Sequence, residues 1–276
     1  MRIPSLETPM SAAADTLSDQ PTPVLRHDVD GIATLTLNRP AQYNTLSRAT
    51  IDALSAALQA IAADPTVRVV VITGTGRAFS TGHDMKEMRA NRDEAFYKRL
   101  LGDCSAMMQA IVALPQPVIA KVQGIATAAG CQLVASCDLA IAAASARFAT
   151  SGINYGLFCS TPAVALSRNV ARKHALEMLY TGDFVDADTA ARIGLVNRAV
   201  DDADLDAEVE ALARKIAAKS GYAIRLGKAS FHAQANQPLD AAYRCASADL
   251  VRNLLAEDGI EGVNAFFEKR EPRYRQ

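Results

Sequence analysis

The chain has 276 residues, of which half are hydrophobic and 21% are charged. This balance excludes a wholly disordered polypeptide and suits one large α/β domain with a helical extension. The 29 basic and 30 acidic side chains leave a net charge of −1, so charge gives no reason to expect nucleic acid or a membrane as a partner.

Residues 1–22 carry charged and polar side chains throughout and are predicted to form a flexible leader. They contain no apolar run for secretion and none long enough to span a membrane. Acidic residues in the leader argue against a transit peptide. Five widely spaced cysteines lack the CxxC pairs of zinc and redox sites, which predicts reduced thiols, no metal site and a cytoplasmic location.

Strand and helix signals alternate after the leader. Residues 31–37 (GIATLTL) predict a strand, which must end before Pro40. Ser47 is a plausible N-cap for a helix whose apolar residues recur at three-to-four spacing, namely Ile51, Leu54, Leu58 and Ile61. Residues 69–73 (VVVIT) are nearly all apolar, as expected for a strand covered on both faces.

The middle of the chain continues this alternation. Three glycines in residues 74–82 (GTGRAFSTG) predict a loop, and a helical region through 100–114 ends before Pro115. Strands are predicted at 118–122 and 139–143, and a loop of small residues after Gly124 leads into a helix around 132–136. Repeated units of this kind imply stacked, covered sheets.

Helical signals dominate from Pro162 onward. They cover residues 163–170, 173–180, 186–192, 204–219 and 239–255. We therefore divide the chain into the leader, an α/β core at residues 23–215 and a C-terminal helical region at 216–276.

Four stretches together resemble the crotonase (enoyl-CoA hydratase/isomerase) superfamily. They are NRPAQYNTLS (38–47), VVVITGTGRAFSTGHDMKE (69–87), PVIAKVQGIATAAGCQLVASCDLAIA (117–142) and FATSGINYGLFCSTP (148–162). The last stretch is most similar to the group called enoyl-CoA hydratase domain-containing protein 3. The resemblance implies a crotonase (ClpP-like) fold of repeated ββα units, with C-terminal helices that form a homotrimer or homohexamer. It also implies an acyl-CoA or enoyl-CoA ligand and no further cofactor, since coenzyme A enters as part of the substrate.

By the same resemblance, the backbone N–H groups of His83 and Ala129 would polarise the thioester carbonyl. Such donors stabilise the negative charge that develops on the oxygen, and small neighbours let the backbone approach the ligand. Taken alone, the three glycines at 74, 76 and 82 could merely shape a tight turn, and their spacing is not the GxGxxG nucleotide signature. The His83 side chain could face solvent or an adenine edge.

The resemblance also implies a set of coenzyme A contacts. They are Tyr43, Thr45, Ala78, Ser80, Gly82, Asp84, Met85 and Gly130. Phe267 and Lys269 would close over the nucleotide end, either in the same chain or across a subunit boundary; the alternative for these two is a solvated amphipathic helix. Asp138 is expected to cap or anchor a strand.

The chain departs from the family at both catalytic glutamates. Gln132 and Gly152 stand at those positions, and neither can take up a proton. We therefore expect an enzyme of this family with weak or atypical hydratase activity. The alternatives are a non-catalytic protein that binds or sequesters acyl-CoA and a structural component of an oligomer.

Overall fold

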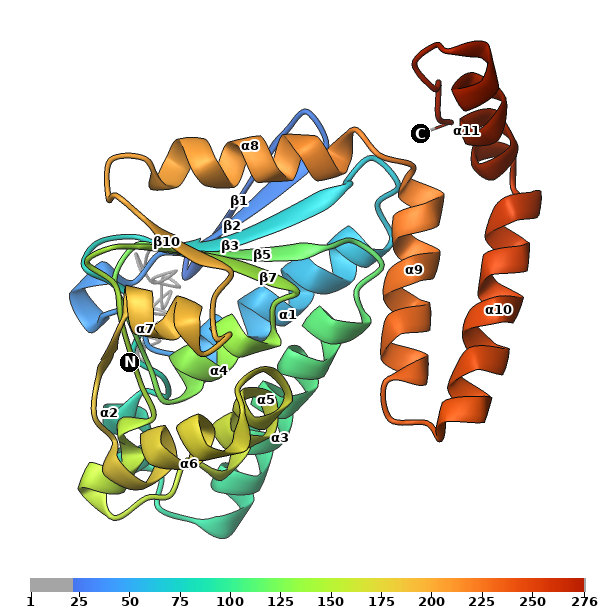
Figure 1. Cartoon of the computed structure of the whole chain (residues 1–276). Coiled ribbons are helices and arrows are strands. Elements are labelled where there is room, and N and C mark those ends of the chain that lie inside the picture. Colours follow the sequence, from blue (N-terminus) through green and yellow to red (C-terminus); the bar gives the residue numbers. More distant parts are fainter. Residues whose placement is uncertain (1–21, 276) are drawn as a thin grey trace, which may run out of the picture.

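The computed structural model describes residues 22–275, so the predicted leader lies outside the described residues up to residue 21 (Figure 1). The strands are β1 (Val24–Val29), β2 (Ile32–Leu37), β3 (Val69–Gly74), β4 (Ala78–Ser80), β5 (Val118–Val122), β6 (Ile125–Thr127), β7 (Leu139–Ala143), β8 (Arg147–Ala149), β9 (Val185–Asp186) and β10 (Arg198–Val200). The helices are α1 (Arg48–Ala62), α2 (Met85–Ala90), α3 (Glu94–Ala113), α4 (Ala129–Ser136), α5 (Ser160–Asn169), α6 (Arg172–Thr181), α7 (Ala187–Arg192), α8 (Leu205–Ala217), α9 (Gly221–Gln234), α10 (Leu239–Leu255) and α11 (Glu257–Glu268), with 3-10 turns η1 (Pro40–Gln42) and η2 (Ser151–Tyr155).

The larger sheet has the order β1-β2-β3-β5-β7-β10 and is parallel except for the β1–β2 pair. In β3, Val70 and Ile72 join the main core, whereas Val69 and Val71 pack in a second cluster with residues of α8. Figure 1 shows α8 on one face of this sheet and α1 and α4 on the other. The prediction that residues 69–73 form a strand covered on both faces is therefore confirmed.

The smaller sheet has the order β4-β6-β8-β9, and β4, β6 and β8 run parallel. The chain order repeats ββα four times, as β1-β2-α1, β3-β4-α2, β5-β6-α4 and β7-β8-α5, which confirms the predicted α/β class. Ser80 pairs with Ala126, and Thr127 pairs with Ala149. Because the carboxyl ends of parallel strands meet at one edge, the segments that follow β4, β6 and β8 come together there.

Helices α9 and α10 form a hairpin beside the core, and α11 lies beyond them (Figure 1). The predicted boundary after residue 215 falls inside α8, which packs on the sheet, so the separate helical part starts with α9. Lys228 of α9 ties this part to the core through hydrogen bonds from Nζ to the carbonyls of Ile111 and Gln116, each 3.1 Å, and to Asp138 Oδ2 at 2.7 Å. Asp138 also accepts the N–H of Val118 at 2.7 Å, so its predicted anchoring role is confirmed.

The five cysteines differ in burial. Cys245 is half-buried, and the other four are buried. Burial disfavours the thiolate and raises the pKa of Cys104 and Cys131 to about 12. We expect a thiol-specific reagent at about pH 8 to label Cys245 first in the native protein and all five cysteines after denaturation. Rapid native labelling of Cys131, read by peptide mass, would contradict this burial.

Candidate functional site

A short segment of backbone, residues 43–46, lies against the loop that follows β4. Ser80 Oγ donates to the Asn44 carbonyl at 2.8 Å, and the Leu46 N–H donates to the Gly82 carbonyl at 2.8 Å. Asn44 is fully buried at φ 53, a conformation that asparagine tolerates better than most residues, and its amide donates to the carbonyls of Thr75 and Ala78. Sequence analysis missed Asn44, which fixes the course of this segment.

The first predicted donor, the N–H of His83, is left free by this arrangement. Leu46 and His83 form an isolated parallel bridge. In it, the Leu46 N–H donates to the carbonyl of Gly82, the residue before His83, and not to His83 itself. The His83 N–H therefore points away from Leu46. None of the hydrogen bonds among residues 22–275 uses it.

The second predicted donor, the N–H of Ala129, is the first of α4. The first N–H groups of a helix have no partner within the helix, and the helix dipole adds to their donor strength. Ala128, which precedes it, has φ 49 and ψ −121 and provides no side-chain cap. Within the described part of the chain, no hydrogen bond uses the Ala129 N–H.

The loops that carry these two donors are in close contact. Gly82 has φ +84, and a Cβ placed on it would lie 3.0 Å from the Ala129 nitrogen. A Cβ on Gly130 would lie 2.0 Å from the Ser80 carbonyl oxygen. Thr127 Oγ1 also donates to the Thr81 carbonyl at 3.2 Å. The structure thus brings the two donor residues into adjacent segments, and their action on one oxygen atom stays a prediction.

Gln132 lies one turn after Ala129, on the same face of α4. Helical side chains lean toward the helix N-terminus, so its amide extends toward the donor end of α4. The residue is only 5% exposed, and its Oε1 has no hydrogen-bond partner among the described residues. An unpaired buried amide oxygen is an acceptor available to a ligand or to water.

Gly152 lies in η2, three residues beyond the Ala149 end of β8. A Cβ on Gly152 would lie 2.5 Å from the Leu157 carbonyl oxygen and 2.8 Å from the Cys159 sulfur. The chain that follows thus occupies the space that a glutamate side chain would need. Burial raises the pKa of the Cys159 thiol, although the Gly152 N–H acts in the opposite direction.

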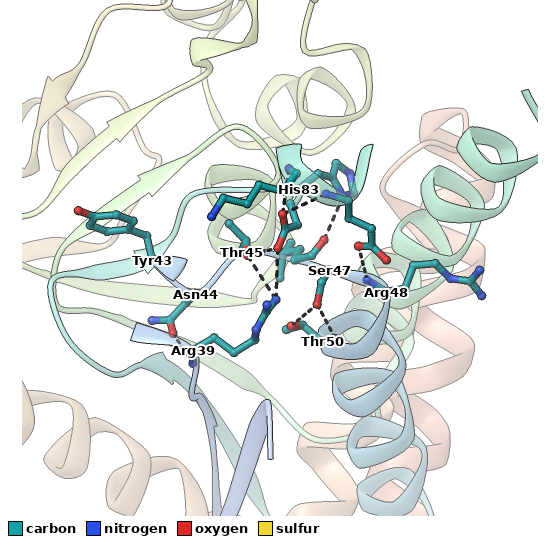
Figure 2. A network of polar contacts seen from close by, with 12 residues as sticks. Arg39, Tyr43, Asn44, Thr45, Ser47, Arg48, Thr50 and His83 are labelled. Carbon is teal, nitrogen blue, oxygen red and sulfur yellow. Dashed lines mark hydrogen bonds and ion pairs between the residues drawn. The ribbon is translucent and has the colours of Figure 1, made fainter. Parts of the chain in front are cut away.

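Two of the predicted coenzyme A contacts, Thr45 and Asp84, belong to one polar network (Figure 2). Thr45 Oγ1 donates to Asp84 Oδ2 at 3.2 Å, and Arg39 pairs with Asp84 at 3.5 Å. Asp84 also caps α2 by accepting the backbone N–H groups of Lys86 and Glu87. The Asp84 carboxylate therefore has structural partners within the chain.

The remaining predicted contacts differ in accessibility. Tyr43 and Met85 are exposed, and the Arg77 guanidinium lies 5.7 Å from the centre of the Tyr43 ring. Ala78 and Ser80 are buried, and Ser80 Oγ is already bonded to the Asn44 carbonyl and the Gly82 N–H. The latter two residues thus support the loop instead of lining its surface. Sequence analysis missed Arg77, which the structure places against the exposed ring of Tyr43.

Phe267 and Lys269 do not join this site within one chain. They belong to the end of α11, which Figure 1 shows far from α2 and α4. Phe267 is 77% exposed. Their predicted contact with the nucleotide therefore requires a second copy of the chain.

Two further observations concern residues 22–275. No group of three or more His, Cys, Asp or Glu side chains there could hold a metal ion. None of the helices in this range is both long and apolar enough to cross a membrane.

Comparison with known proteins places these features in context. The sequence pattern of the enoyl-CoA hydratase/isomerase family matches residues 28–276. A Xenopus laevis protein called mitochondrial enoyl-CoA hydratase domain-containing protein 3 is 44% identical over 256 residues, which are 93% of this chain and 87% of that protein. A crystal structure of an enoyl-CoA hydratase from Mycobacterium smegmatis has 52% identity and a TM-score of 0.90, with 92% of this chain and 99% of that one covered. The crystal structure of human enoyl-CoA hydratase domain-containing protein 3 is 44% identical with a TM-score of 0.89, and the match covers 91% of this chain and 100% of that one. The predicted crotonase fold is confirmed.

The comparisons also correct one prediction. The Xenopus relative and its rat, mouse, human and zebrafish counterparts are all named as mitochondrial. The predicted cytoplasmic location is therefore wrong. It rested on the acidic leader and on unpaired cysteines, and neither feature separates one reducing aqueous compartment from another.

Proposed function

Since the chain belongs to the enoyl-CoA hydratase/isomerase family, we propose that it binds an acyl-CoA or enoyl-CoA thioester at the His83 and Ala129 N–H groups. Proton removal from such a thioester, or addition of water to it, places negative charge on the carbonyl oxygen. Two donors fixed before the reaction stabilise that charge without reorganising.

The contact between the Gly82 and Ala129 loops carries this proposal. The 3.0 Å approach of a Gly82 Cβ to the Ala129 nitrogen shows that the two segments leave no room for a side chain between them. Both donor N–H groups lack a partner in the described part of the chain. Backbone N–H groups without a partner are uncommon in the interior of a protein, and two in adjacent segments favour an external acceptor.

The acid and base chemistry of this site is weak. A positioned acid or base contributes typically about 10²–10⁴ in rate, and neither Gln132 nor Gly152 can provide one. We therefore expect slow hydration of enoyl thioesters. A non-catalytic acyl-CoA binding protein is the second candidate, favoured by the Leu157 carbonyl that fills the side-chain space at Gly152.

Ligand binding and turnover separate these functions. An acyl-CoA such as butyryl-CoA at about 100 times its Kd should stabilise the chain by about 2.7 kcal/mol, seen as a higher melting temperature. Slow loss of crotonyl-CoA, above the rate without protein, would identify the enzyme; binding without hydration, isomerisation or hydrolysis would identify the binding protein. If no coenzyme A compound shifts the melting temperature, both are refuted in favour of a structural component.

A single substitution should increase hydration. In Gln132→Glu, a carboxylate would stand near the donor end of α4, and we expect crotonyl-CoA hydration to rise by about 10²-fold or more. The isosteric shape keeps the fold, and Gln132→Ala serves as the control that has no carboxylate. Adding Gly152→Glu should destabilise the protein without further gain, because its Cβ would overlap the Leu157 carbonyl. An equal rate in Gln132→Glu and Gln132→Ala would contradict this placement of the site.

We also propose assembly into a homotrimer or homohexamer through the C-terminal helices. Large apolar side chains are exposed along α10 and α11, including Leu239, Leu255, Phe266 and Phe267. Light scattering after gel filtration should give three or six times the 29.3 kDa chain mass.

A further inference from the structure

The His83 imidazole is turned into the protein, so of the two options that the sequence left for it, solvent or an adenine edge, the first is wrong. Its Nδ1 lies 3.4 Å from the Leu46 carbonyl oxygen, beside the start of α1 (Figure 2). Its Nε2 is buried and has no hydrogen-bond partner among the described residues. The ring therefore packs against the Leu46 backbone.

These contacts identify the protonation state of the ring. A carbonyl oxygen only accepts hydrogen bonds, so Nδ1 must carry the proton and Nε2 must be bare. Protonation of Nε2 would bury both a positive charge and an unpaired donor. The neutral ring with a proton on Nδ1 is thus the state that fits this space.

The His83 ring and the Gly82 carbonyl both bond to the same residue, Leu46. Leu46 is fully buried, and its N–H donates to the Gly82 carbonyl at 2.8 Å, while its own carbonyl receives the His83 ring. Since the ring and the N–H of His83 share one Cα, an anchored ring restricts the direction of that N–H. We propose that His83 is a positioning residue, whose neutral imidazole on the Leu46 carbonyl aims the adjoining N–H at the ligand, and that a charge on the ring, which burial disfavours more than the Leu46 carbonyl favours it, drives the ring out of this place. This inference rests on the proposed function.

Charged groups near the ring come from three segments. The Leu46 carbonyl and Glu87 of α2 both favour the protonated ring, and Glu87 Oε2 accepts the backbone N–H of Arg48 of α1 at 3.0 Å. Asp84, next to His83, is paired with Arg39. Burial has the largest effect and lowers the pKa of His83 below its usual value of about 6.5. Because the pKa is depressed, the ring stays neutral at about pH 6.5, and the hold is lost only as the pH falls through the lower, folded-state value.

The test compares His83→Asn with His83→Ala. An asparagine amide nitrogen takes nearly the place of Nδ1 and donates at every pH, whereas alanine has no donor. We expect the wild-type affinity for butyryl-CoA, from calorimetry, to hold at about pH 6.5 and to fall as the pH passes through the lower pKa of the His83 ring. His83→Asn should bind within about threefold of the wild type at about pH 8 and stay constant down to about pH 5, and His83→Ala should bind about tenfold more weakly throughout. The exposed His174, changed to Asn, should retain the wild-type pH profile.

Three results would overturn the inference. One is the wild-type pH profile in His83→Asn, and another is full affinity in His83→Ala. The third is a ring that nitrogen NMR of the free protein shows protonated on Nε2 at about pH 8. If the wild type fails to bind any acyl-CoA at about pH 8, the proposed function is refuted and this inference with it. The three results above refute the inference alone.

Discussion

Gly82→Ala should lower any turnover of an acyl-CoA by about 10²–10³-fold, the usual effect of losing one donor of an oxyanion site. The added Cβ would lie 3.0 Å from the Ala129 nitrogen and cover the face of that N–H. If the protein only binds its ligand, the Kd should rise about tenfold, as expected for one lost hydrogen bond. Calorimetry with butyryl-CoA and turnover of crotonyl-CoA would measure the two effects.

Gly156→Ala is the matched control for this substitution. Gly156 has a similar positive φ of +75, but a Cβ there would meet nothing within 4 Å. Both variants therefore carry the left-handed strain of about 1–2 kcal/mol, and only Gly82→Ala covers a donor. Equal affinity losses in the two variants would show that strain, not the donor, is responsible.

Lys228→Met should destabilise the protein by about 2–3 kcal/mol in urea unfolding. Nζ of Lys228 bonds to the Asp138 carboxylate at 2.7 Å and to two carbonyls, and the Lys228 side chain is only 9% exposed. Removing one partner of a buried pair costs about 3–5 kcal/mol, and the Asp138 side chain, 20% exposed, recovers some hydration. The loss should appear mainly as loosened docking of α9, seen as faster amide exchange in that helix.

An exposed ion pair provides the comparison. Lys121 pairs with Asp206, whose side chain is 83% exposed, at 2.6 Å. Lys121→Met should change the free energy of unfolding by no more than about 1 kcal/mol. If both methionine variants lose the same stability, burial is not what makes the Lys228 contact important.

The longer elements could be predicted from the sequence because their apolar spacing is clear. Strands β5 and β7 were predicted with their observed ends, and Ser47 caps α1 by accepting the Thr50 N–H. The missed strands of the smaller sheet have two or three residues each, too few to show an alternating pattern. Helix α9 was missed because it begins at Gly221 and contains Gly227, two residues that weaken a helical signal.

The candidate site was only partly predictable. Resemblance to the family indicated His83 and Ala129, and the parallel register of β4, β6 and β8 explains why the segments that carry them lie side by side. The inward turn of the His83 ring depends on Leu46, 37 positions away in the chain. The filled space at Gly152 depends on a turn that brings the Leu157 carbonyl back over it. Such features follow from tertiary contacts, which a local pattern does not encode.

Ala128 holds its positive φ through contacts within the chain. Hydrogen bonds of 3.0 Å fix it on both sides, from its own N–H to the Ala149 carbonyl and from the Gln132 N–H to its carbonyl. A backbone of this kind stores about 1–3 kcal/mol, which folding has already supplied. If the proposed ligand binds here, it needs no ordering of this loop, and its association rate should depend on diffusion and access instead of a slow internal rearrangement.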